Sequence, residues 1–185
     1  STAATRLGLP AIPAVAEEVA VARDLLLAQT AGGRLHFTHL STARAVTMLR
    51  QAQEQGIHVT AAVPASHLLL TCDDIKDYNT NFKLSPPLGE KNDQEALIDA
   101  TKAGTLAAIV TDHTPCAPEQ KDVEFAAAAW GGSFLRHAFP LLYTQLVCPG
   151  KLDLATLITR LTHGPAQILA LDQAGTLKPG MPADI

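Results

Sequence analysis

Two short segments of this sequence place ionisable side chains directly after apolar runs. Residues 106–110 are five apolar residues in a row, as expected of a strand buried on both faces of a parallel sheet, and Asp112 and His113 follow almost at once. Residues 34–40 alternate as a strand does and end in His39 and Leu40. In a (β/α) barrel, the C-terminal ends of the strands are where catalytic groups are placed. The alternative is a loop-capping carboxylate beside a structural histidine.

An imidazole and a carboxylate at two strand ends are suitable ligands for zinc. His39 and Asp112 are 73 positions apart, but in a barrel both strand ends open on the same face. Catalytic zinc takes three protein ligands, so the remaining ligands are expected outside this chain. His36, His58 and His67 are predicted to be wall or core histidines.

Composition narrows the class of protein. The chain has 185 residues, of which 47% are hydrophobic and 17% charged, which is enough for one sizeable core. The net charge of −4 without a basic stripe argues against nucleic-acid binding, and no apolar run is long enough to span a membrane. Three cysteines without CxxC spacing and the lack of a signal-peptide pattern predict a reducing, cytoplasmic location.

Helical and strand patterns alternate along the chain. An apolar face at helical spacing over residues 13–29 includes Val15, Val19, Leu25 and Leu26. Ser41 and Thr42 are N-cap candidates for the helix that follows the first strand. The alternation predicts an α/β fold with a parallel sheet, either doubly wound or part of a barrel, since three strands cannot close one. We expect strands at 34–40, 57–63 and 106–110, a loop at 73–88, and helices at 13–29, 43–55, 66–72, 92–103, 133–147, 152–162 and 165–169.

Several motifs also follow one another in order along nearly the whole chain. They are His36-Phe-Thr-His39-Leu-Ser-Thr42, residues 59–63 with His67-Leu-Leu-Leu, Ser85-Pro-Pro-Leu88, Thr111-Asp-His-Thr-Pro115, Lys121 to Phe125, Gly164-Pro-Ala166 and Gly180-Met-Pro-Ala-Asp184. Together they resemble bacterial dihydroorotases of the multifunctional-complex type, in the amidohydrolase superfamily. The resemblance implies a TIM (β/α)8 barrel. Residues 1–173 would then be its C-terminal part, strands six to eight with their helices, and residues 174–185 the beginning of a small β-sandwich.

The resemblance implies a zinc-dependent cyclic amide hydrolase that interconverts N-carbamoyl-aspartate and dihydroorotate in pyrimidine biosynthesis. The zinc centre would be binuclear. His39 would bind one metal ion, while Asp112 would bind the other and shuttle the proton. The remaining metal ligands, an HxH pair, a carboxylated lysine and a histidine, are expected before Ser1, in the rest of the barrel. This chain alone is therefore expected to be inactive.

Substrate contacts depart from the pattern of these dihydroorotases more than metal ligands do. Trp130 and Gly131 keep the positions of a substrate-contacting pair, whereas Ser85 and Cys116 replace a substrate-binding asparagine and histidine. Other replacements are Ala62 and Arg136 for glutamates and Gly89 for an arginine. Three hypotheses remain: an active enzyme, expected to be a homo-oligomer, a weakened paralogue that serves as a scaffold for aspartate transcarbamoylase, or an α/β domain without metal. Retention of His39 and Asp112 favours the enzyme.

Overall fold

A three-stranded parallel sheet forms the centre of the fold. The computed structural model describes residues 2–182. The strands are β1 (Leu35–Phe37), β2 (Val59–Pro64) and β3 (Ala108–Val110), and they lie in the order β1-β2-β3. Leu35 is paired with Val59 and Ala62 with Ala108, so all three C-terminal ends lie at one edge of the sheet. The predicted α/β fold with a parallel sheet is confirmed.

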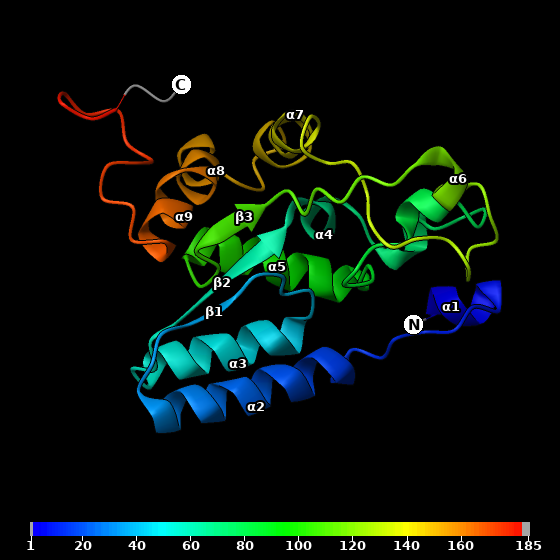
Figure 1. Cartoon of the computed structure of the whole chain (residues 1–185), viewed down its shortest axis with the longest axis horizontal. Helices are drawn as coiled ribbons and strands as arrows, with labels where there is room; N and C mark the ends of the chain where they lie inside the picture. Colours follow the sequence, from blue (N-terminus) through cyan, green and yellow to red (C-terminus); the bar gives the residue numbers. More distant parts are fainter. Residues whose placement is uncertain (1, 183–185) are drawn as a thin grey trace.

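Helices flank this sheet along its length (Figure 1). The helix α2 packs against α3 beside β1, α3 packs against α5, and α8 and α9 contact β3. A π-helical turn, η3, continues directly from α7. The bounds are α1 Thr2–Leu7, α2 Val15–Ala31, α3 Ala43–Glu54, α4 Ala65–Leu69, η1 Cys72–Asp74, η2 Thr80–Phe82, α5 Lys91–Ala103, α6 Pro118–Lys121, α7 Ala138–Leu142, η3 Tyr143–Val147, α8 Leu154–Leu161 and α9 His163–Ile168.

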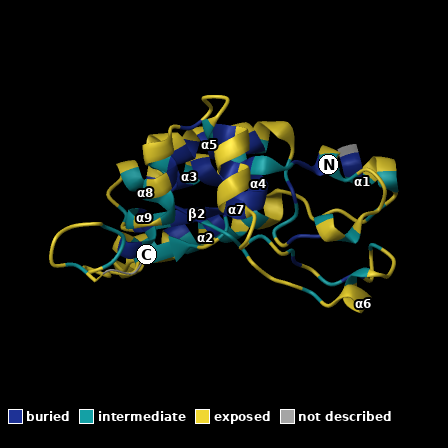
Figure 2. Cartoon of the chain, turned by 90° about the horizontal axis from the view of Figure 1, so that it is seen from above, coloured by how far each residue is buried: buried dark blue, intermediate teal, exposed yellow. Residues whose placement is uncertain are grey.

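The main core lies between the sheet and its helices. Figure 2 shows buried residues on β2, α3, α4 and α5, whereas α6 and the long loops around it are mostly exposed. Five of the six residues of β2 are buried, as expected of a strand covered on both faces. A second, smaller core lies beneath α1 and the segment after α4, and its buried members are Ala3, Cys72, Leu84 and Leu88. The largest fully buried aliphatic side chains are Leu40, Leu49, Leu68, Leu97, Leu106, Leu142 and Leu157.

Helix ends follow the predicted caps. The hydroxyl of Thr42 accepts a hydrogen bond from the backbone N–H of Ala45 at the start of α3. Gly32 and Gly104 end α2 and α5 with φ of 66° and 87°, conformations that glycine adopts without steric cost. In the part of the chain that the structure describes, no helix is long and apolar enough to cross a membrane.

Some predicted elements were wrong in extent. The helix expected from Ser133 begins at Ala138, because residues 132–135 instead bond to the segment after β3, and Pro140 suits a first helical turn. The strand expected through Leu40 ends at Phe37, and residues 2–7 form the helix α1, which was not predicted. In residues 174–182 there is no strand, and residues 183–185 lie outside the described part.

Part of the expected burial was also wrong. On α2, the apolar positions Val15, Val19 and Leu26 are exposed, whereas Val21 and Leu25 are buried, because within the described residues the helix packs mainly against α3. His58 is exposed rather than in the core, since it precedes β2 instead of lying within it.

Candidate active site

His39 and Asp112 meet at the C-terminal edge of the sheet. The distance from His39 Nε2 to Asp112 Oδ1 is 3.5 Å, with the side chains 34% and 16% exposed. His39 lies two residues after β1 and Asp112 two residues after β3, so the parallel order of the strands brings the two loops to the same side. The predicted convergence of these residues is therefore observed. Both groups remain partly accessible to a ligand.

The backbone at Asp112 turns sharply out of β3. Its φ is 48°, in the left-handed region where aspartate is enriched among the non-glycine residues. The following residues are fixed by a parallel bridge between His113 and Gly132 and by a hydrogen bond of 3.0 Å from Thr114 N–H to the Gly132 carbonyl. The backbone N–H of Leu135 also donates to His113 Nδ1 at 3.2 Å. These bonds hold the loop and with it the Asp112 carboxylate.

His36 lies beside this pair as part of the wall. Its Nδ1 is 2.8 Å from the Thr60 hydroxyl on β2. Burial lowers the pKa of His36 below its ordinary value, and the neighbouring His39 lowers it further. The wall role predicted for His36 is confirmed.

His67 is buried on α4 and connects two segments. Its Nδ1 is 3.0 Å from the Ser66 hydroxyl, and its Nε2 lies 3.1 Å and 3.2 Å from the carbonyls of Pro86 and Pro87. Because carbonyl oxygens only accept, the Nε2 carries the proton and donates it to them. Burial lowers the pKa of His67, which favours this neutral form. His67 therefore fixes the segment directly after Ser85.

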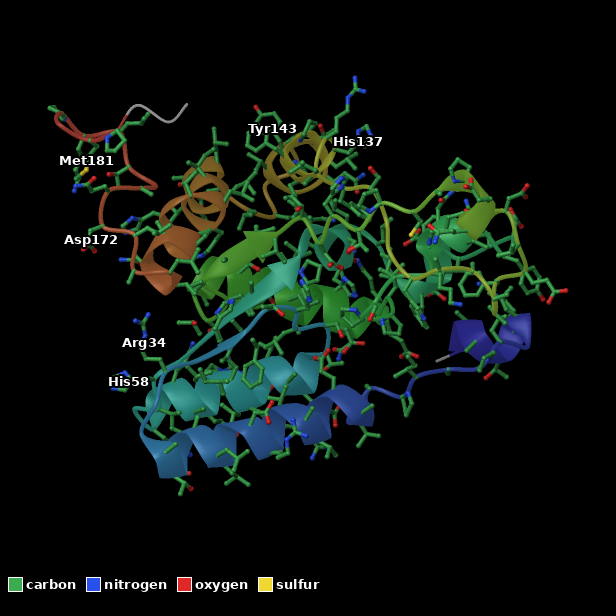
Figure 3. The ribbon with its side chains drawn as sticks, viewed as in Figure 1. Arg34, His58, His137, Tyr143, Asp172 and Met181 are labelled. Atoms are coloured by element: carbon green, nitrogen blue, oxygen red, sulfur yellow. The ribbon has the colours of Figure 1, made fainter. Side chains whose placement is uncertain are left out.

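Histidines elsewhere take no part in this edge. Figure 3 shows His58 near Arg34 at the N-terminal ends of the strands, opposite the edge where His39 and Asp112 meet. His137 lies at the start of α7 and is exposed.

Three of the four residues predicted to contact substrate cluster after β3. The Cys116 thiol donates to the Trp130 carbonyl with an Sγ to O distance of 3.4 Å. The backbone N–H of Gly131 donates to the Lys83 carbonyl at 2.9 Å, and Lys83 Nζ lies 4.8 Å from the Trp130 ring centroid. Ser85 is exposed, two residues after Lys83. The indole is 45% exposed, so its position is fixed while part of its surface remains available.

The arrangement of His39 and Asp112 fits a metal site that needs further ligands. His39 Nε2 and Asp112 Oδ1 lie 3.5 Å apart, close enough for both to be ligands of one metal centre. Among residues 2–182, however, no group of three or more histidine, cysteine, aspartate or glutamate side chains is placed to hold a metal ion. The two donors are too few for a catalytic zinc by themselves.

Comparison with known families identifies the domain. Residues 10–185 match the Amidohydrolase family. The chain belongs to this family. The match covers β1, β2 and β3 together with both His39 and Asp112, so the candidate site lies entirely within the amidohydrolase domain.

Individual relatives agree with this assignment. The chain is 48% identical over 181 residues to a dihydroorotase of Syntrophus aciditrophicus and 42% identical over 181 residues to a dihydroorotase of Carboxydothermus hydrogenoformans. Each match covers 98% of this chain and 42% of the relative, so the chain spans less than half the length of these relatives. The resemblance to bacterial dihydroorotases that the motifs indicated is thus confirmed.

Solved structures of a hydantoinase and of a dihydropyrimidinase show the same fold. An L-hydantoinase (dihydropyrimidinase) from Arthrobacter aurescens superposes with a TM-score of 0.88 at 28% identity, over 92% of this chain and 39% of that one. A dihydropyrimidinase from Brevibacillus agri superposes with a TM-score of 0.84 at 27% identity, again over 92% of this chain and 39% of that one.

Two lysines beside Trp130 and Cys116 were given no role from the sequence. The Lys83 ammonium donates to the Ala126 carbonyl at 2.7 Å, and the Lys121 ammonium donates to the carbonyls of Thr80 and Ala129 at 3.0 Å and 2.8 Å. Burial lowers the pKa of Lys121. The lysines tie the loop that carries Trp130 to the segment before Ser85. Lys121 stood in a recognised motif, but the pairing of these segments is visible only in the fold.

Proposed function

We propose that this chain is part of a zinc-dependent hydrolase of cyclic amides, and that the whole protein is a dihydroorotase. The observation that supports this most directly is the approach of His39 Nε2 to Asp112 Oδ1 at 3.5 Å, at the sheet edge formed by parallel strands. An imidazole and a carboxylate there supply a metal ligand and a proton acceptor. The dihydroorotase relatives and the hydantoinase neighbours support a cyclic amide or ureide as substrate.

In this proposal each residue of the chain has a separate task. His39 would hold zinc through Nε2, and zinc, when bound, would lower the pKa of a bound water molecule to about 7. Asp112 accepts the proton of the attacking water and returns it to the amide nitrogen as the ring opens. Trp130 and Gly131 contact the substrate ring, with Ser85 and Cys116 beside them. In ring closure the same proton transfers run in reverse.

The fold proposal follows from the same observations. Three parallel strands in the order β1-β2-β3, with α3 packed against β2 and with α8 and α9 packed against β3, are suited to be the last three strands of a TIM barrel, whose helices form an outer ring. Exposed apolar side chains on α2, α7 and α8 would pack against the remainder of such a barrel. We propose that residues 1–173 belong to this barrel and that residues 174–185 begin a β-sandwich, with the other ligands of a binuclear zinc centre outside this chain. The large exposed side chains on these helices include Val19, Leu26, Leu27, Phe139, Leu141, Leu154 and Ile158.

Replacing Asp112 with asparagine in the full-length protein tests the proposal. The asparagine side chain keeps the shape of the aspartate but cannot accept the proton. We expect hydrolysis of dihydroorotate to fall by about 100- to 10,000-fold, the usual contribution of a general base. The matched control is Asp99→Asn on α5, where the carboxylate is exposed and lies 3.8 Å from Lys102 Nζ. That variant is expected to keep the unmodified rate.

Circular dichroism and zinc content distinguish the outcomes. A folded, zinc-loaded Asp112→Asn protein with near-normal turnover would exclude Asp112 from the mechanism. If the unmodified, zinc-loaded protein hydrolyses neither dihydroorotate nor hydantoin, the hydrolase proposal fails. Binding to aspartate transcarbamoylase under those conditions would support the scaffold alternative, which the replacements at Ser85 and Cys116 favour.

A further inference from the structure

One carboxylate outside the candidate site binds the loop that follows His39. Glu17, in the first turn of α2, accepts hydrogen bonds from the backbone N–H groups of Ser41 and Thr42, each at 3.0 Å to Oε1. It also accepts the hydroxyls of Ser41 at 2.5 Å and Thr42 at 2.9 Å. Four donors of two consecutive residues therefore converge on one side chain that is 24 and 25 positions away in the sequence.

Ser41 and Thr42 are buried, so these hydrogen bonds are shielded from water. The two residues are 5% and 6% exposed. A second carboxylate completes the arrangement, because Asp93 of α5 accepts the next backbone N–H, that of Ala43, at 2.9 Å. The positive end of the α3 dipole favours both negative charges. We call these contacts of Glu17 and Asp93 the α3 clamp.

The α3 clamp is one of two fixed points around His39. The second lies between His39 and the clamp, where the Leu40 N–H donates to the Ala62 carbonyl of β2 at 3.0 Å and Leu40 is 1% exposed. His39 itself lies between these anchors and the end of β1, in a segment without regular secondary structure. Within that segment the Thr38 hydroxyl lies 3.4 Å from His39 Nδ1, and no helix or strand holds the backbone of residues 38–40. The anchors next to it fix the backbone from which the His39 imidazole reaches Asp112.

We infer that Glu17 is a positioning residue that holds His39 toward Asp112. The inference rests on the proposed function for its catalytic consequence, but the structural link does not depend on activity. Glutamine cannot replace Glu17, because one of its two terminal atoms is an NH₂ group, which would face N–H and O–H donors. A buried donor is then left without an acceptor, and the loop has to move to satisfy it. A displacement of about 1 Å at a catalytic group lowers the rate by about 100-fold.

The neighbouring Glu18 provides a matched control. Its carboxylate also faces α3 and lies 3.6 Å from Arg44 Nε, but that arginine side chain is 74% exposed. Glu18→Gln removes the same charge from the same helix turn without changing the α3 clamp. A third variant, Ser41→Ala, removes only the hydroxyl bond to Glu17 and leaves the carboxylate in place.

The experiment compares Glu17→Gln, Ser41→Ala and Glu18→Gln in the full-length protein. It measures kcat and KM for dihydroorotate, amide hydrogen exchange at Ser41 and Thr42, and the imidazole ¹⁵N signals of His39, assigned with His39→Ala. For Glu17→Gln we expect kcat to fall by about 10- to 100-fold at unchanged KM. The two amides should lose protection, and the His39 signals should move toward their positions in Asp112→Asn. Ser41→Ala should lower kcat by about 3- to 10-fold, and Glu18→Gln should match the unmodified protein.

Each result decides for or against the positioning role. Unchanged kcat and unchanged His39 signals in a folded Glu17→Gln protein overturn it, as does a fall in kcat that Glu18→Gln reproduces. If Glu17→Gln does not fold, Ser41→Ala decides, and unchanged His39 signals there mean that the clamp only stabilises the fold. If the unmodified protein has no activity on cyclic ureides, the proposed function fails, while the His39 signals and hydrogen exchange still test the positioning role.

Discussion

Gly131 connects the cluster of Trp130, Cys116 and Lys83 to the loop of Asp112, and a single methyl group there should disrupt the connection. Its φ is +124°, which side chains rarely adopt, and an added Cβ would lie 2.5 Å from the Thr114 carbonyl oxygen and 2.8 Å from Thr114 Cβ. The backbone strain is about 1–3 kcal/mol, and the forced shift of the neighbouring backbone adds about 1–3 kcal/mol. We therefore expect Gly131→Ala to lower the free energy of unfolding by about 2–6 kcal/mol.

Alanine substitutions at two other glycines separate backbone strain from the steric contact with Thr114, when the free energy of unfolding is measured from urea unfolding curves. Gly150 has φ of +76° with nothing within 4 Å of an added Cβ, so Gly150→Ala measures backbone strain alone, about 1–2 kcal/mol. Gly33 has neither a positive φ nor a neighbour within 4 Å, and Gly33→Ala should cost almost nothing. If Gly131→Ala is no more destabilising than Gly150→Ala, the close approach to Thr114 is not a real constraint and the argument is refuted.

Two further predictions concern pH and substrate affinity. Burial lowers the pKa of His67, although the Pro87 and Pro86 carbonyls and the carboxylates of Glu17 and Asp112 act to raise it. Below the ordinary pKa of histidine, the unfolded chain therefore binds a proton at His67 that the folded chain does not bind. The free energy of unfolding should fall as the pH drops below about 6.5, and it should fall less steeply in His67→Gln than in the unmodified protein. The urea midpoint measured as a function of pH checks this, and equal slopes for the two proteins would refute it. The paired change Ser85→Asn and Cys116→His should lower KM for dihydroorotate by about 5-fold or more, since each restores a hydrogen-bonding partner. An unchanged KM would show that these positions do not determine affinity.

The parallel sheet and the meeting of His39 with Asp112 could be predicted from sequence for a physical reason. A run of apolar residues indicates a strand buried on both faces, and helices that alternate with such strands connect them as crossovers, which makes the strands parallel. Once the strands are parallel, polar residues that follow them must share one edge. The chain needs no further information to bring an imidazole and a carboxylate together over 73 positions.

The segment between Gly131 and Ala138 shows where such reasoning fails. Residues 133–147 have helical composition, but the first five form a turn because Leu135 N–H and Gly132 bond to the loop after β3. Long-range hydrogen bonds of this kind compete with the local helix, and their partners are not visible in the local pattern. The exposed positions of α2 have a similar cause, since an apolar face is buried only where another element covers it.

Glu17 illustrates the same limit at the candidate site. In the sequence it is one of two adjacent glutamates on the polar face of a helix, and its neighbour Glu18 forms an ion pair with an exposed arginine. Only the packing of α2 against α3 distinguishes them, because it directs Glu17 toward four donors and Glu18 toward solvent-exposed Arg44. Strand ends therefore indicate which residues carry the chemistry. The side chains that orient these residues lie on the flanking helices. In the sequence their charge and spacing resemble those of ordinary surface residues, so only the hydrogen bonds that they form with each loop distinguish them.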